Sequence, residues 1–96
     1  MSFAGRLAER VYVESEIPSC HASKREIENG LTGALLGLPG EWRVEILCSR
    51  SDTWWMLRVD GPRFTWTVVL TDSAEQSARE MTRRLLQALR ERKLVS

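Results

Sequence analysis

The sequence predicts an α+β two-layer sandwich, in which a three-stranded antiparallel β-meander is covered on one face by helices. The first observation is a set of three apolar runs between residues 42 and 70, separated by Ser49-Arg50-Ser51-Asp52 and by Asp60-Gly61-Pro62. The runs are rich in Val, Ile, Thr, Phe and Trp and alternate in character, which is typical of strands joined by short turns. The second observation is helical spacing of apolar residues on both sides of this region.

Alternation along the three runs assigns the two faces of the sheet, because successive strand residues point to opposite sides. The predicted core face is apolar throughout and collects Trp42, Val44, Ile46, Cys48, Trp55, Leu57, Val59, Phe64, Trp66, Val68 and Leu70. The opposite face is mostly polar, as expected for an antiparallel sheet with one open face. Four apolar residues interrupt it, namely Leu47, Trp54, Met56 and Val69.

The N-terminal stretch fits two structures. Apolar residues recur at helical spacing from Phe3 to Val11, and Ser2 is a suitable cap, so we favour a helix over residues 3–14. The alternative is a strand over residues 10–14, because Val11-Tyr12-Val13 prefers extended structure. Pro18 ends whichever element precedes it, and residues 15–22 are expected to form a linker.

A second helix is expected to begin at Ser23, because Ser23 and Glu26 have the spacing of a capping box. Its apolar stripe consists of Ile27, Leu31, Ala34, Leu35 and Leu38, and Pro39-Gly40 ends it. Three glycines, Gly30, Gly33 and Gly37, share one side of this predicted helix. We expect this smooth side to receive the core-facing tryptophans. The alternatives are docking of a partner and a locally weak helix.

The last helix is predicted over about residues 73–92. Asp72 and Glu75 have capping-box spacing, and Ala74, Ala78, Met81, Leu85, Ala88 and Leu89 form its apolar face. Glu75–Arg79 and Glu80–Arg84 are spaced for ion pairs between successive turns.

Length and composition indicate one small domain over residues 1–96, with a helical extension at 1–16 and an α-β-β-β-α core at 23–93. The 14 basic and 13 acidic residues leave a net charge of +1, so no global field attracts nucleic acid or a membrane. The chain has no run of 18 apolar residues and no secretory signal pattern, so we expect a cytoplasmic protein without a membrane partner.

No residue pattern carries recognisable catalytic chemistry. Cys20 and His21 are neighbours, but adjacent residues on a linker rarely aim at each other, and no third group orients them. A zinc site formed by Cys20, His21 and Cys48 would lack a fourth ligand and the usual spacing. Phosphate-binding and dinucleotide-binding motifs are absent. We therefore expect no enzyme activity, cofactor, metal or small-molecule substrate.

The α-β-β-β-α order from Ser23 to Lys93 resembles the double-stranded RNA-binding domain in topology and element length. That resemblance implies RNA binding through basic residues at the start of the last helix and a loop between the first two strands. The matching helix start here reads Asp72-Ser73-Ala74-Glu75-Gln76, which is acidic, and the first hairpin loop is short. The alternative function is therefore nucleic-acid binding on the basic side of this helix, through Arg79, Arg83 and Arg90.

The favoured function is a small regulator, adaptor or inhibitor that binds another protein through the open face of the sheet. Tryptophan, methionine and arginine are enriched at protein interfaces. The predicted binding residues are Arg43, Leu47, Trp54, Met56, Arg58, Arg63 and Val69, with the arginines as a rim. The alternative is that the N-terminal helix covers this face through Phe3, Leu7 and Val11. A homodimer is also expected, formed by the open face or by an edge strand.

Overall fold

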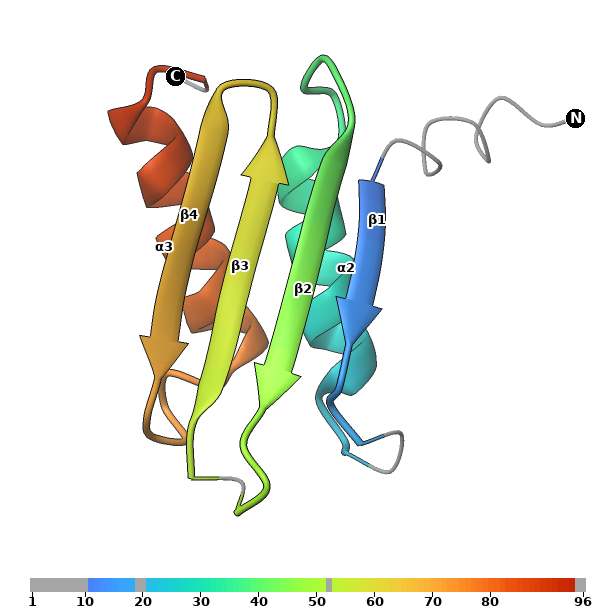
Figure 1. The fold of residues 1–96 in the computed structure, drawn as a ribbon, viewed down its shortest axis with the longest axis vertical. Coiled ribbons are helices and arrows are strands. Elements are labelled where there is room, and N and C mark those ends of the chain that lie inside the picture. The colour runs from blue at the N-terminus through green and yellow to red at the C-terminus, as the bar shows by residue number, and fades with distance from the viewer. Residues whose placement is uncertain (1–10, 19–20, 52, 95–96) are drawn as a thin grey trace, which may run out of the picture.

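A computed structural model describes residues 11–18, 21–51 and 53–94. Four strands, β1 (Val11–Ser15), β2 (Trp42–Cys48), β3 (Trp55–Gly61) and β4 (Phe64–Leu70), form one sheet in the order β1-β2-β3-β4. Helices α2 (Lys24–Leu35) and α3 (Ala78–Glu91) lie together on one face of this sheet, and the other face is open (Figure 1). The fold is therefore α+β with a mixed four-stranded sheet.

The predicted meander forms three of the four strands, because β2, β3 and β4 pair antiparallel in sequence order. The fourth strand, β1, pairs parallel with β2, so that Val11 lies opposite Trp42 and Val13 opposite Val44. The helix prediction is therefore wrong over residues 11–14, while its first part, residues 3–10, lies outside the described residues. The β-branched residues Val11 and Val13 pack on the core side of the sheet. Their strand preference and this burial stabilise the extended structure more than the helical spacing of the apolar residues stabilises a helix.

The assignment of the core face is confirmed. Leu57, Val59, Val44 and Ile46 are fully buried between the sheet and the helices. Trp42 and Trp55 are only 2% and 3% exposed. Residues 15–22 are not simply a linker, since Ser15 belongs to β1 and Ile17 is 2% exposed. The connection from β1 to α2 thus contributes the side chain of Ile17 to the core.

Helix α2 differs from the prediction at both ends. Ser23 is its N-cap but makes no side-chain capping bond, so the predicted capping box does not form. The helix ends at Leu35, which leaves Gly37 outside it with a φ of +90°. Its apolar stripe is confirmed, with Ile27, Leu31 and Leu35 buried.

The glycines of α2 do not receive the tryptophans. A Cβ at Gly30 would come within 2.6 Å of the Thr82 hydroxyl on α3, whereas a Cβ at Gly33 would contact nothing within 4 Å. The glycine that makes room for a tryptophan is Gly61 on β3, where a Cβ would overlap the Trp42 ring. The prediction failed because spacing within one helix does not reveal which element lies against it.

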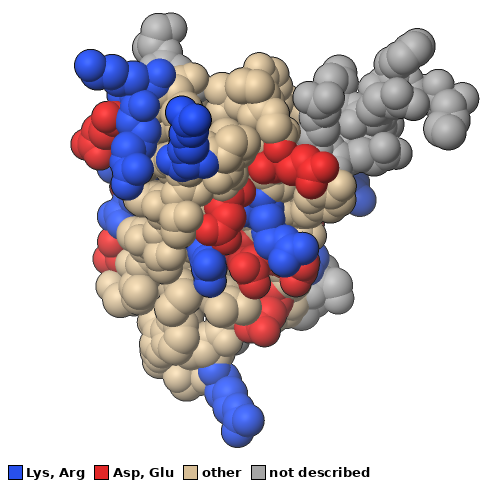
Figure 2. Space-filling view, turned by 45° about the horizontal axis from the view of Figure 1, so that its top comes forward, with Lys and Arg blue, Asp and Glu red and all other residues tan. Residues whose placement is uncertain are grey.

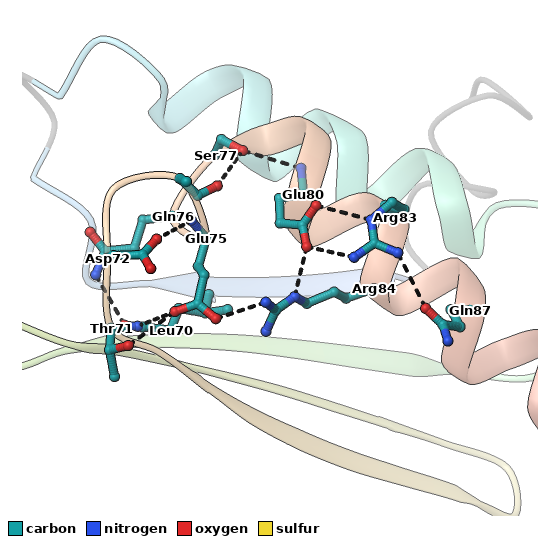
Figure 3. Close-up of polar contacts among 11 residues, drawn as sticks. Leu70, Thr71, Asp72, Glu75, Gln76, Ser77, Glu80, Arg83, Arg84 and Gln87 are labelled. Atoms are coloured by element: carbon teal, nitrogen blue, oxygen red, sulfur yellow. Dashed lines mark hydrogen bonds and ion pairs between the residues drawn. The ribbon is translucent and has the colours of Figure 1, made fainter.

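Helix α3 begins at Ala78, five residues later than predicted, with Ser77 as its N-cap. The Ser77 hydroxyl accepts a hydrogen bond from the Glu80 N–H at 3.2 Å. Asp72 accepts from the Glu75 N–H at 2.8 Å, but this contact closes a turn before the helix rather than capping it. Glu75 consequently lies outside α3 and pairs with Arg84 at 2.7 Å instead of Arg79 (Figure 3).

Candidate functional site

The open face is organised in rows that cross the strands. Strand register places Leu47 opposite Met56, and Met56 opposite Val69, so three apolar side chains form one continuous row. Leu47 is 38% exposed and Val69 is 47% exposed, while Met56 between them is half-buried. This row brings together three residues that the sequence predicted for the binding surface.

Trp54 lies two residues before Met56 and enlarges this apolar group along the chain, toward the β2–β3 loop. It is 39% exposed and directly precedes β3. The loop is held by Ser49, whose hydroxyl accepts from the N–H groups of Thr53 at 3.0 Å and Trp54 at 3.2 Å. The Ser49 N–H in turn donates to the Trp54 carbonyl at 3.0 Å. We call Leu47, Trp54, Met56 and Val69 the apolar patch.

Charged side chains form the next row toward the centre of the face. Glu14 of β1 lies opposite Glu45 of β2, and Glu45 lies opposite Arg58 of β3. Arg58 is paired with Asp60 on its own strand, at 3.0 Å, rather than with Glu45. Among the described residues, neither Glu14 nor Glu45 forms an ion pair, although like charges placed opposite each other are unfavourable.

The view of this side of the molecule shows the same division. Acidic and basic side chains are interleaved across its middle, whereas mostly uncharged surface extends over the β4 side and the lower part, from whose tip a basic side chain projects (Figure 2). Basic side chains also gather at the upper left (Figure 2). The C-terminal end of α3 carries the exposed residues Arg90, Arg92 and Lys93.

The predicted arginine rim is brought together only in part. Arg58 borders the apolar patch, one row away from Met56. Arg43 lies a further row away, opposite Asp60, and Arg63 lies in the β3–β4 turn at the far end of the sheet, with a φ of +58°. A hollow of about 390 Å³ opens beside Arg43 and is lined by Tyr12, Glu41, Trp42, Arg43, Asp60 and Gly61.

Strand β1 also contributes to this face, which the sequence pattern did not predict. Tyr12, which is 47% exposed, and Glu14 lie on the open side, next to Arg43 and Glu45. The signal that could have found them was the extended preference of Val11-Tyr12-Val13, which was the less favoured alternative. As β1 places Val11 on the core side, Val11 cannot belong to a helix that covers Trp54; Phe3 and Leu7 lie outside the described residues.

The arginines proposed for nucleic-acid binding are exposed on α3, but one of them is already engaged. Arg83 contacts both carboxylate oxygens of Glu80, at 2.9 and 2.6 Å, and reaches Gln87 at 3.3 Å. Arg84 joins the same group, at 3.0 Å from Glu80 (Figure 3). Hydrogen bonds from Arg83 and Arg84 lower the pKa of Glu80 to about 2. This charge-paired group leaves Arg79 and Arg90 as the other two predicted contacts.

The Cys20–His21 pair is not completed by other reactive groups in the described part of the chain. Cys20 itself lies outside the described residues. His21 stacks edge-on against Trp55, with ring centroids 5.4 Å apart, and its Nδ1 accepts from the Ser23 N–H at 3.2 Å. Residues 11–18, 21–51 and 53–94 contain no group of three potential metal ligands.

Comparison with models of known protein families, with curated proteins and with solved structures found no match for this chain. Within the described residues, neither helix has the length and apolar character needed to cross a membrane. The candidate site is therefore defined by its own geometry: an exposed apolar patch beside a row of charges on an otherwise polar sheet face.

Proposed function

We propose that this protein is a non-enzymatic binding module and that the open face of its sheet binds another protein. The observation that carries the proposal is the apolar patch, in which three side chains from three strands form one row and the exposed Trp54 follows two residues before Met56. Core packing does not require these residues, because the opposite face of the same strands already contains the buried side chains. Apolar and aromatic groups surrounded by charges are typical of the centre and rim of protein interfaces.

The charged row adds a preference for the partner's chemistry. Glu14 and Glu45 are register partners on neighbouring strands, so two acidic residues adjoin each other in the row next to the apolar patch, and a cation from the partner would relieve their repulsion. Arg58 is already paired with Asp60 and serves as a polar border. We therefore propose a partner surface with apolar side chains opposite the patch and a lysine or arginine opposite Glu14 and Glu45.

Site-specific photo-crosslinking tests this proposal in cells of the source organism. A photoreactive amino acid at Leu47 or Val69 is expected to capture one distinct protein, and the same group at Gln87, which is exposed on α3, is expected not to capture it. Leu47→Glu should abolish capture from position 69. Thr65→Glu, on the same face but two rows from Leu47, is the matched control and should preserve it.

Two results would contradict the proposal. Capture that maps to α3 rather than to the sheet would place the binding surface elsewhere. Capture that survives Leu47→Glu and Val69→Glu would show that the apolar patch is not needed. The preference for a cation is checked separately with Glu14→Gln and Glu45→Gln, which should weaken binding and reduce its dependence on salt.

The alternative proposal is nucleic-acid binding through Arg79, Arg83 and Arg90. It predicts retention on RNA or heparin at low salt, with a steep loss as salt rises, because released counterions drive such binding. Arg79→Gln and Arg90→Gln should then reduce retention, whereas Leu47→Glu should not change it. Such results would indicate that α3, and not the open face of the sheet, is the functional surface.

A further inference from the structure

The β4 edge of the sheet is suited to pairing with another strand. In the part of the chain that the structure describes, β4 is paired on one side only, with β3. Phe64 closes a two-residue turn opposite Gly61, and bonded and non-bonded residues alternate along an antiparallel strand. The backbone N–H and C=O groups of Thr65, Thr67 and Val69 therefore point away from β3. Such a row is a template for a further strand.

The two edges of the sheet differ in how they are protected. Strand β1 has five residues, carries the exposed Glu14, and is followed by the exposed Glu16 and by Pro18. Strand β4 has seven residues, with the sequence FTWTVVL, and contains neither a charge nor a proline. Charges and prolines are the usual means of blocking an edge, so β1 is blocked and β4 is not.

The core side of the β4 edge is also incompletely covered. Leu57 and Val59 on β3 are fully buried, whereas Val68 and Trp66, which lie opposite them on β4, are only half-buried. The hydrophobic layer between sheet and helices thus reaches the β4 edge with exposed apolar surface. A further strand beside β4 would cover these two side chains.

We propose that the occupant of this edge is β4 of a second copy, paired antiparallel about a two-fold axis with Thr67 opposite its own counterpart. Thr67 is the middle residue of the strand, so this is the register that pairs all seven residues. It directs the outward groups of Thr65 at those of Val69 of the copy. On the core side it places Trp66 opposite Val68 of the copy, an aromatic–β-branched pair of the kind that stabilises sheets.

A second copy suits this edge because the strand is self-complementary. No like charges meet along β4, both half-buried core residues are covered at once, and closed two-fold pairing leaves no β4 edge exposed. The product is a continuous sheet in which the open faces of both copies lie on the same side. This inference does not rest on the proposed function, since it uses the outward backbone groups of β4, whereas the proposed function uses the side chains of the apolar patch; Val69 belongs to both.

Charge reversal at Thr67 tests the register. Thr67 is exposed, so Thr67→Lys and Thr67→Glu are expected to fold, which circular dichroism checks. Sedimentation of the full chain should show a dimer for wild type. Each single variant should raise the dimer dissociation constant by about tenfold or more, because like charges face each other across the axis. Mixing the two variants should restore a dimer that contains one copy of each.

Two controls separate this edge from other modes of association. Thr65→Lys adds the same charge to the same strand but faces Val69 of the copy, so its dimer should persist. Leu47→Glu alters the apolar patch and should also leave the dimer intact. The proposal is overturned by a monomeric wild type at high concentration, by dimers of Thr67→Lys as tight as wild type, or by dissociation through Leu47→Glu alone.

Discussion

The two faces of the sheet use the same strands for different purposes. On β3, Leu57 and Val59 are fully buried beneath the helices, while their neighbours Met56 and Arg58 lie on the open face. The core face is apolar at every predicted position, but the open face has an apolar row at one end and charges in its middle. Apolar character on the open face is therefore not a by-product of folding, and it needs a separate explanation.

The largest expected effect is a difference in unfolding free energy between alanine substitutions at two adjacent residues of β3. Leu57→Ala should lower the free energy of unfolding by about 2–5 kcal/mol, because it leaves a cavity in a fully buried site. Met56→Ala, one residue earlier on the open face, should cost less than about 1 kcal/mol. Urea denaturation followed by circular dichroism measures both.

Equal losses of unfolding free energy for these two substitutions would contradict the difference between the two faces. They would mean that Met56 is covered in the folded protein as fully as Leu57. A repeat with residues 1–9 deleted would then identify the cover: the cost of Met56→Ala would fall if the N-terminal segment provides it.

Replacing glycine by alanine is expected to change stability in opposite directions in the sheet and in helix α2. Gly61→Ala should destabilise the protein by about 1–3 kcal/mol, since the added Cβ overlaps the Trp42 ring on the core face. Gly33→Ala should stabilise it by about 0.5–1 kcal/mol, because nothing obstructs a Cβ there and alanine favours the helix. Thermal unfolding of the two variants measures the contrast. Stabilisation by Gly61→Ala would contradict the close approach of strand and ring.

Tryptophan accessibility sharpens the comparison without a large change in stability. Trp54 is 39% exposed, whereas Trp42 and Trp55 are 2% and 3% exposed. Trp54→Phe should therefore remove a large share of the fluorescence that acrylamide quenches, and change stability by no more than about 0.5 kcal/mol. Trp55→Phe is the control on the core face and should leave quenching almost unchanged. If Trp55→Phe removed the quenchable fluorescence and Trp54→Phe did not, Trp55 would be the exposed tryptophan and Trp54 the buried one.

The smallest expected effect lies outside both faces, in the exposed ion pairs of α3. Arg83 and Arg84 lower the pKa of Glu80 from 4.5 to about 2 in the folded protein. Since the folded pKa is the lower one, the stabilisation is present above pH 4.5 and is lost as the pH falls from 4.5 toward 2. An NMR titration of the Glu80 carboxyl should have its midpoint near 2.

Solvent screening keeps this contribution small, because the Glu80 side chain is partly exposed to water and its partner Arg83 is exposed. Glu80→Gln should make stability less dependent on pH between 4.5 and 2. A Glu80 midpoint at its ordinary value, together with an unchanged acid limb in Glu80→Gln, would contradict the ion pairs.

The sequence alone determined the strands of the meander and their faces. Alternation is a local property, because a residue's side is set by its neighbours, and it correctly placed Leu57 in the core and Met56 on the open face. It also identified the four residues of the apolar patch. The stripe of α2 and the Glu80–Arg84 pair were predictable for the same reason, since both depend on spacing within one helix.

Features that depend on contacts between distant residues could not be predicted and are seen only in the folded chain. Val11-Tyr12-Val13 became β1 because β2 offers a parallel edge and a place in the core, which outweighs the helical pattern. Glu75 forms an ion pair with Arg84 because α3 starts at Ala78, so that Glu75 lies in the preceding turn. Gly61 is required by a ring that lies 19 positions earlier in the chain, at Trp42. Where two local structures have similar intrinsic stability, contacts with other elements decide which one forms. These contacts involve residues far apart in the sequence, so they cannot be read from the local pattern.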